Sequence, residues 1–207
     1  MVNDGKYAVT GSEGEWQPGS NDQVLKNTLN IIDPEEMADV ETDLLLKLYE
    51  HIFGRDLPSH LTAEIIQTWH SWWLGNLYPW AGQLRSVNMS KPDINFAGAK
   101  YIPSLLSKFS SSHLEQYNNL PSYDDEKLFS YLAESHVEFI LIHPFREGNG
   151  RISRLLIDVM ATKAGFEPLD YTLWDQHKAF YFKSIQAGRD GDFSHMTRLV
   201  RDVIKQA

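Results

Sequence analysis

The sequence contains no cysteine, and its longest uninterrupted apolar runs are four residues, as in 139–142. The first absence excludes disulfide bonds, thiolate metal sites and a cysteine nucleophile, and it is typical of a reducing compartment. The second argues against a transmembrane helix, which needs about 20 apolar residues. The N-terminal residues also lack the apolar segment of a secretory signal. We therefore expect a cytoplasmic protein without a membrane span.

Basic residues are outnumbered by acidic ones, with 19 Lys and Arg against 28 Asp and Glu and a net charge of −9. Proteins that bind nucleic acid generally draw their affinity from a basic face, so we expect no nucleic-acid partner. This balance leaves room for a local basic cluster around one phosphorylated ligand. Arg146, Arg151 and Arg154 fall within nine residues and form such a cluster.

The remaining composition, with 42% hydrophobic and 23% charged residues, is that of a globular domain. Turn-forming residues dominate 1–24, which we interpret as an irregular lead-in to one domain over 25–207. Hydrophobic periodicity and capping residues, including Asp33 and either Asp124 or Asp125, predict an all-α bundle. The expected helices cover 34–53, 63–75, 98–117, 124–142, 150–164, 173–187 and 193–206.

One segment breaks the helical pattern. Residues 84–89 alternate with period two, a turn-like stretch follows, and 94–96 has the character of a second short strand. This pattern predicts a single small β-hairpin. The helix over 63–75 carries three tryptophans whose helical spacing predicts a place in the core: Trp69, Trp72 and Trp73.

The segment 143–154, His-Pro-Phe-Arg-Glu-Gly-Asn-Gly-Arg-Ile-Ser-Arg, carries the clearest chemical signal. Pro144 ends the preceding apolar helix at His143, and the Gly-Asn-Gly run permits positive φ before the next helix begins at Arg151. A glycine-rich loop that leads into a helix presents free N–H groups at the positive helix end, which suits an anion. Arg151 and Arg154 share one helical face, and their guanidinium groups suit phosphate oxygens.

Two further side chains of this segment indicate chemistry in addition to binding. Glu147 would repel an anion unless a divalent cation lay between them, and Mg²⁺ held by one carboxylate and phosphates is the usual arrangement. His143 supplies a base or acid that titrates near neutral pH. Together these features indicate nucleotide and Mg²⁺ chemistry, although a helix–loop–helix corner with Gly-Asn-Gly also occurs as plain structure.

These twelve residues resemble the signature of the Fic family, His-Pro-Phe-x-Asp/Glu-Gly-Asn-Gly-Arg-x-x-Arg, at every specified position. The segment 78–85 is similar to the family's Trp-Ala-Gly-x-x-Arg segment, which precedes its hairpin, and 25–27 resembles the start of its core. The resemblance implies a Fic-type helical bundle with a β-hairpin flap. It also implies a mostly bacterial class of enzymes that transfer AMP from ATP to a hydroxyl group of a target protein and release pyrophosphate.

Carried over residue by residue, the resemblance implies that His143 is the general base for a Tyr, Ser or Thr hydroxyl and that Glu147 binds Mg²⁺. It implies that Arg151 grips the phosphates and that Arg154 engages the γ-phosphate of ATP. Tyr181 would lie near the adenine, although core packing also accounts for this residue. The residues that would contact ATP are Gly148, Asn149, Gly150, Arg151, Arg154 and Tyr181.

The family's hairpin holds the backbone of the target protein as an added strand. Its counterparts in this sequence are Ser86, Val87, Asn88, Met89, Ile94, Asn95 and Phe96. A plain connection between helices is the alternative interpretation of this hairpin.

Many Fic proteins are silenced by a helix with the pattern Ser/Thr-x-x-x-Glu-Gly/Asn, whose glutamate pairs with the second signature arginine, here Arg154. This sequence departs from the pattern, since Glu13 has Val9 and not Ser or Thr four residues before it. We therefore favour inhibition by a separate antitoxin-like protein, as in a toxin–antitoxin pair. An unregulated enzyme and an atypical plug formed by Glu13 are the alternatives.

Two further functions stay open from the sequence alone. The same site could transfer another group, such as UMP, phosphocholine or phosphate, or the chain could be a nucleotide-binding regulatory module without catalysis. The presence of both His143 and Glu147 favours catalysis, because binding alone needs no base.

Overall fold

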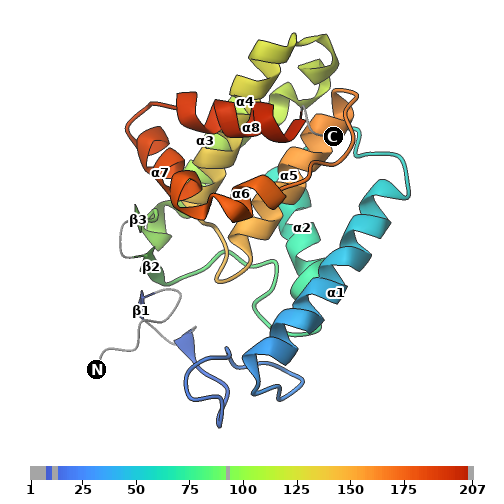
Figure 1. Ribbon diagram of the computed structural model, residues 1–207. Helices are drawn as coiled ribbons and strands as arrows, with labels where there is room; N and C mark the ends of the chain where they lie inside the picture. Colours follow the sequence, from blue (N-terminus) through green and yellow to red (C-terminus); the bar gives the residue numbers. More distant parts are fainter. Residues whose placement is uncertain (1–7, 11–13, 92–93, 205–207) are drawn as a thin grey trace.

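The computed structural model describes residues 8–10, 14–91 and 94–204 and is built mainly of helices (Figure 1). The helices are α1 (Pro34–Phe53), α2 (Ala63–Leu74), α3 (Ile102–Ser112), α4 (Asp125–Ile142), α5 (Asn149–Lys163), α6 (Thr172–Gln176), α7 (Lys178–Arg189) and α8 (Ser194–Ile204), with the 3₁₀ segments η2 (Ala99–Tyr101) and η3 (Leu114–Ser122). Three short strands, β1 (Ala8–Thr10), β2 (Asn88–Lys91) and β3 (Ile94–Asn95), form one small sheet. The predicted all-α class is confirmed, and none of the described helices is long and apolar enough to cross a membrane.

Several helices begin where capping side chains are available. The Asp33 carboxylate accepts hydrogen bonds from the N–H groups of Glu35 and Glu36, both at 2.9 Å, at the start of α1. Thr62 and Asp124 accept equivalent bonds at the starts of α2 and α4. Each cap satisfies N–H groups that the first helical turn leaves unpaired. The sequence therefore predicts these three helix starts correctly.

The prediction of one continuous helix over 98–117 is wrong, because the structure divides this region into η2, α3 and η3. Leu114, Tyr117 and Leu120 lie three residues apart and are all buried. That spacing matches the three residues per turn of a 3₁₀ helix, so one face of η3 can face the core continuously. The helix predicted over 173–187 is likewise divided, into α6 and α7.

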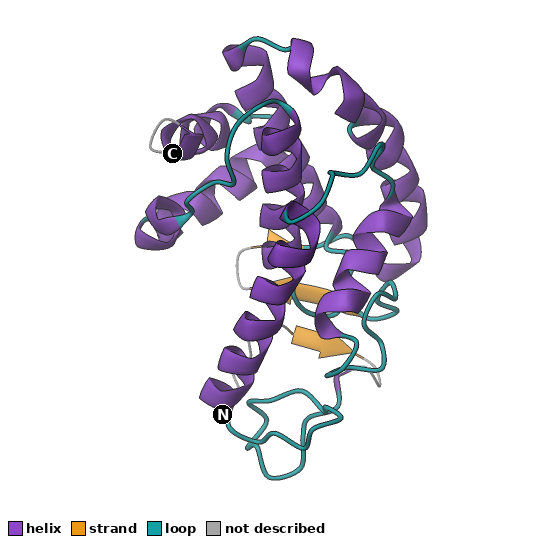
Figure 2. Cartoon of the chain, turned by 90° about the vertical axis from the view of Figure 1, so that its right-hand side faces the viewer, coloured by secondary structure: helices purple, strands orange, loops and turns teal. Residues whose placement is uncertain are grey.

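Helix α4 lies at the centre of the bundle and packs against α5, α7 and α8. Its Leu132, Ala133, Val137 and Phe139 side chains are fully buried, as expected of a helix that is covered on most sides. Helices α1 and α2 pack against each other, and α2 also contacts α5. Figure 2 shows how small a share of the chain the three strands form beside these helices. Most residues of both α4 and α5 are buried, so the loop that joins these helices is anchored at both ends in the core.

The predicted hairpin is present as the antiparallel pair of β2 and β3, but its first strand is displaced along the chain. Leu84 and Arg85 lie outside β2, whereas Ser90 and Lys91, which we expected in the turn, lie within it. Ser86, Val87 and Phe96 lie outside the strands. The Val87 carbonyl accepts a hydrogen bond from the Arg85 guanidinium at 2.5 Å, so this backbone is tied to a side chain and not to a neighbouring strand. The lead-in, which we expected to be irregular, contributes β1, and β1 pairs with the other edge of β2.

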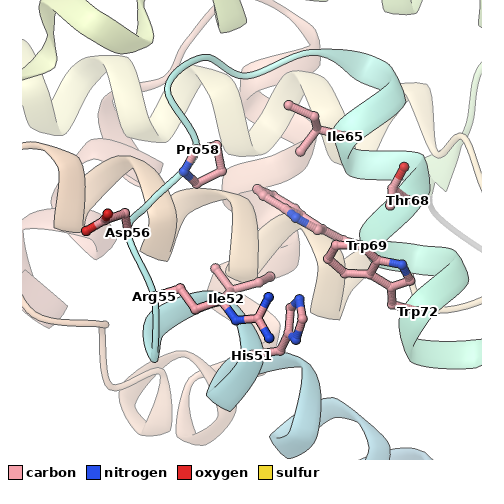
Figure 3. Close-up of a pocket in the computed structure, with 9 residues that line it drawn as sticks. All are labelled: His51, Ile52, Arg55, Asp56, Pro58, Ile65, Thr68, Trp69 and Trp72. Carbon is pink, nitrogen blue, oxygen red and sulfur yellow. The ribbon is translucent and has the colours of Figure 1, made fainter.

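Of the three tryptophans of α2, Trp69 and Trp73 are buried, but Trp72 is 55% exposed, so the predicted burial is wrong for Trp72. Figure 3 shows Trp69 and Trp72 in a groove of about 260 Å³ between the end of α1, the following loop and α2. The His51 ring meets the Trp72 ring edge-on at 4.8 Å. None of the residues that line this groove belongs to 143–154.

Three histidines are almost completely buried among the helices, namely His70, His136 and His143, and a fourth, His113, is buried with its pKa lowered chiefly by that burial. Burial disfavours the charged imidazole, and it lowers the pKa to about 4 for His70 and to about 3 for His136 and His143. All three side chains are therefore neutral in the folded protein at pH 7.

We predict that these histidines make the folded state less stable in mild acid. The unfolded chain takes up their protons near pH 6.5, whereas the folded protein binds them only at about pH 4 or 3. The stabilisation is complete above pH 6.5 and is lost as the pH falls below it. Between pH 7.5 and 5.5 we expect a loss of roughly 1 kcal/mol per buried histidine. Asp158 offsets part of this loss, since burial raises its pKa to about 6.

Urea unfolding at pH 7.5 and 5.5 measures this dependence. His136→Asn should make the difference between the two pH values smaller by roughly 1 kcal/mol, since it removes one of the contributing groups. His60→Asn, at an exposed histidine, should leave the difference unchanged. Equal pH dependence in the wild type and His136→Asn would contradict the assignment.

Candidate functional site

The loop 143–148 turns the chain sharply between α4 and α5. His143 ends α4 in a left-handed conformation with φ 50°, and Gly148 precedes α5 with φ 79°. The Asn149 side chain closes the loop, because its Oδ1 accepts from the Phe145 N–H at 2.9 Å and its Nδ2 donates to the Phe145 carbonyl at 2.8 Å. The start of α5 is thereby fixed beside His143, as an anion site at a helix N-terminus requires.

The two glycines of the loop have different reasons to be glycine. A Cβ on Gly148 would lie 2.5 Å from Cζ3 of Trp73, and its positive φ also disfavours a side chain. A Cβ on Gly150 would meet nothing within 4 Å. Gly148 is therefore required by the close contact with α2, whereas Gly150 leaves open space at the wall of a cavity.

This cavity has a volume of about 220 Å³ and gathers most of the predicted site. Its lining includes the predicted residues His143, Glu147, Gly148, Gly150, Arg151, Arg154, Tyr181, Ile94 and Phe96. The predicted residues Ser86, Val87, Asn88, Met89, Asn95 and Asn149 do not line it, and the Asn149 side chain is fully buried within the loop. No motif pointed to the remaining lining residues, which are Lys91, Ile140, Lys178 and Phe182.

His143 is held in the form that can accept a proton. Its Nδ1 lies 3.1 Å from the Ile140 carbonyl, which can only accept, so Nδ1 carries the hydrogen and Nε2 carries the lone pair. Its ring stacks on Phe96 at 3.6 Å. Burial, with a smaller contribution from the Arg85 charge, lowers its pKa to about 3. The imidazole is therefore neutral near pH 7 and can serve as a base.

The backbone of Glu147 is fixed by a hydrogen bond from His70, a residue to which no motif in the sequence pointed. The Gly82 N–H donates to Nδ1 of His70 at 2.8 Å, so His70 carries its hydrogen on Nε2 and donates it to the Glu147 carbonyl at 3.0 Å. The Glu147 carboxylate accepts from the Gly148 N–H at 3.0 Å. The carboxylate is 8% exposed at the cavity wall, where it can meet a cation.

Each of the two signature arginines meets a carboxylate from another helix. Arg151 lies 2.7 Å from Glu41 of α1, and Arg154 forms two hydrogen bonds with Asp175 of α6, at 3.1 and 2.7 Å. Arg154 also lies over the Tyr171 ring at 5.0 Å. Neither carboxylate belongs to a recognisable motif, so no sequence signal could have found them.

Tyr181 is both a core residue and a wall of the cavity. It is 8% exposed, and its hydroxyl pairs with Nε2 of His136 at 2.8 Å. The other ring nitrogen of His136 pairs with Ser153 at 2.8 Å. This chain of hydrogen bonds fixes the tyrosine ring relative to α5. Packing in the core and a place beside a ligand in the cavity are therefore compatible interpretations of Tyr181.

The geometry as a whole suits an anionic ligand accompanied by a cation. A neutral base, one carboxylate and two guanidinium groups share a small cavity at the start of a helix. Such a set can hold phosphates and accept a proton from a hydroxyl group.

Comparisons with known proteins agree with this geometry. The model of the Fic/DOC family matches residues 60–161. The probable protein adenylyltransferase Fic of Salmonella typhimurium is 28% identical over 92% of this chain and 91% of its own length. The protein adenylyltransferase Fic of Aedes aegypti is 36% identical over 35% of this chain, and the match spans 14% of that relative's length.

Among solved structures, the Bartonella tribocorum effector BepC with bound AMPPNP has the same fold. It superposes with a TM-score of 0.72 at 21% identity, over 86% of this chain and 91% of that chain. The signature loop, the helical fold around it and the likeness to relatives along nearly the whole chain lead to one conclusion. Residues 60–161 of the chain belong to the Fic/DOC family, and the likeness to the Salmonella typhimurium relative extends over 92% of the chain.

Proposed function

We propose that this chain is a protein adenylyltransferase, which transfers AMP from ATP to a Tyr, Ser or Thr hydroxyl group of a target protein. The observation that carries the proposal is the gathering of His143, Glu147, Arg151 and Arg154 around one cavity. Two further findings support it. Relatives carry the name protein adenylyltransferase, and the BepC structure contains the ATP analogue AMPPNP.

In the proposed reaction, the hydroxyl oxygen of the target attacks the α-phosphorus of ATP. The bond from that phosphorus to the oxygen bridging to the β-phosphate breaks, and pyrophosphate leaves. Nε2 of His143 takes up the hydroxyl proton, since Nδ1 is already held by Ile140. Such displacements depend on positioning and charge neutralisation more than on covalent catalysis, and Arg151 and Arg154 supply positive charge toward the phosphates.

Mg²⁺ fits this site as a partner of the nucleotide. Glu147 is the one carboxylate among the residues that line the cavity. Within the described part of the chain, no group of three or more His, Asp and Glu side chains suits a metal ion, so phosphates and water would complete the coordination. The ion would neutralise phosphate charge when bound.

The proposal extends to the target and to control of the enzyme. Ile94 and Phe96 of the hairpin line the cavity, and Phe96 touches His143, which supports the hairpin as the place where the target backbone is held. Among the described residues, Arg154 pairs with Asp175 and not with a glutamate, and Glu13 lies outside them. Because the sequence has Val9 and not Ser or Thr four residues before Glu13, our proposal for control is inhibition by a separate protein. The likeness to the Salmonella typhimurium relative supports a bacterial origin.

We predict that His143→Ala lowers the rate of AMP transfer by about 10²- to 10⁴-fold, because the variant lacks the general base. Its affinity for ATP should change little, since the arginines and Glu147 remain. Mass spectrometry of cell extract incubated with ATP measures the transfer, and the mass of the adduct distinguishes AMP from UMP, phosphocholine and phosphate. His60→Ala, at an exposed histidine, is the control. An undiminished rate in His143→Ala would refute the assigned base.

We predict that Glu147→Gln changes ATP affinity in opposite directions with and without Mg²⁺. With Mg²⁺ the variant should bind ATP more weakly, because a ligand of the ion is missing. In EDTA it should bind ATP at least as tightly as the wild type, because a negative charge beside the phosphates is gone. Calorimetry of ATP binding under both conditions checks this. Equal weakening under both conditions would mean that Glu147 is structural.

A further inference from the structure

We propose that Glu41 is a positioning residue of this site: it holds the Arg151 guanidinium at the cavity wall and keeps it from moving closer to Glu147. The inference rests on the proposed function for the ligands of Arg151 and Glu147, which are the phosphates of ATP and Mg²⁺. Glu41 lies on α1, outside the residues 60–161 that match the family model.

The Glu41 carboxylate is fixed at both of its oxygens. Oε2 lies 2.7 Å from a guanidinium nitrogen of Arg151, and Oε1 accepts a hydrogen bond from the Tyr78 hydroxyl at 2.9 Å. The residue is 7% exposed, so water competes little for these contacts. An ion pair this short between groups that water reaches little is weakly screened, so it draws the guanidinium toward α1.

Glu41 also fixes the surface on which Arg151 rests. The indole N–H of Trp73 donates to the Glu41 backbone carbonyl at 2.8 Å. The Arg151 guanidinium lies over the Trp73 ring at 4.4 Å, within the range of a cation–π contact. One residue of α1 therefore holds both the countercharge and the aromatic platform of Arg151.

Arg151 lies between two carboxylates at unequal distances. The same guanidinium nitrogen is 2.7 Å from Glu41 and 3.6 Å from Glu147, and the longer distance is outside the range of a hydrogen bond. Glu147 and Arg151 are four residues apart, a spacing that favours an ion pair, and at 3.6 Å they form one that is longer than the pair with Glu41. Without the charge of Glu41, we expect Arg151 to turn toward Glu147. That movement would withdraw the guanidinium from the phosphates and cover the carboxylate that meets Mg²⁺.

The direction in which Glu41→Gln changes ATP affinity separates the positioning role from a simple charge effect. Glu41→Gln removes a negative charge near the phosphates, so electrostatics alone predicts tighter ATP binding. The positioning role predicts weaker binding. The weakening should depend on Glu147, since Glu147 is the competing partner of Arg151.

A double-mutant cycle on the full chain tests this dependence. Calorimetry in EDTA measures ATP affinity for the wild type, Glu41→Gln, Glu147→Gln and the double variant. We expect Glu41→Gln to weaken ATP binding about tenfold when Glu147 is present, but less than about threefold when Glu147 is replaced by Gln. In the wild-type background, Glu41→Gln should also raise the Mg²⁺ concentration that gives half-maximal transfer.

Two further variants complete the test. Glu50→Gln, at an exposed position of α1, should leave ATP binding unchanged. Tyr78→Phe removes the hydrogen bond to Glu41 without changing any charge, and we expect the same dependence on Glu147 with a smaller effect. Circular dichroism shows whether Glu41→Gln folds. If it does not fold, Tyr78→Phe still tests whether the loss of ATP affinity depends on Glu147.

The possible outcomes separate the positioning role from the proposed function. Equal losses in both backgrounds, or tighter binding by Glu41→Gln, would overturn the positioning role alone. Coupled losses in a protein that transfers no AMP would support the positioning role and overturn the proposed transfer. A wild type that does not bind ATP would overturn both.

Discussion

The pair of hydrogen bonds between the Asn149 side chain and the Phe145 backbone is the constraint on which the site depends. It closes a loop that places His143 in left-handed backbone, a conformation that costs a residue with a side chain about 1 kcal/mol or more. Stacking helps to offset this cost, since the His143 ring lies on Phe96 and the Phe145 ring lies on His70 at 4.0 Å. These hydrogen bonds and ring contacts together fix the loop, and the loop in turn fixes His143, Glu147 and the start of α5 relative to one another.

The charges of the site are compensated by partners that differ in accessibility. The Glu41 side chain is 9% exposed and the Asp175 side chain is 57% exposed. An exposed ion pair contributes little free energy, so under the proposed function phosphate oxygens would replace Asp175 at Arg154 with little loss. Glu41 is buried and keeps its contact with Arg151. The two signature arginines thus have different roles before any ligand arrives, one fixed and one exchangeable.

Sequence reasoning succeeded where the determining interactions are local. The caps at Asp33, Thr62 and Asp124 act within one helical turn, and the loop from His143 to Arg154 is closed by residues four apart. A pattern in the sequence can report such contacts because its members are close neighbours along the chain.

It failed where contacts join distant segments. Glu41, His70 and Asp175 approach the signature from three other helices, and nothing in their own neighbourhoods marks them. Strand β1 is defined by its pairing with β2, about 80 residues later, and its own three residues carry no strand pattern. Trp72 is exposed although it shares the helical spacing of the buried Trp69 and Trp73, because the packing of α1, α3 and α5 around α2 decides which of its faces are covered.

The contact between Glu41 and Arg151 also has a consequence for the order of events during synthesis. The loop and its hydrogen bonds join near neighbours, so they can form as soon as α4 and α5 have left the ribosome. The Glu41 carboxylate on α1 is made much earlier and can contact Tyr78, but its ion pair with Arg151 forms only when α5 docks against α2. Closing that long stretch of chain carries an entropic cost that only tertiary packing repays. The ion pair at the cavity wall is therefore complete only when α1, α2 and α5 have packed together, and a half-made chain has the signature without it.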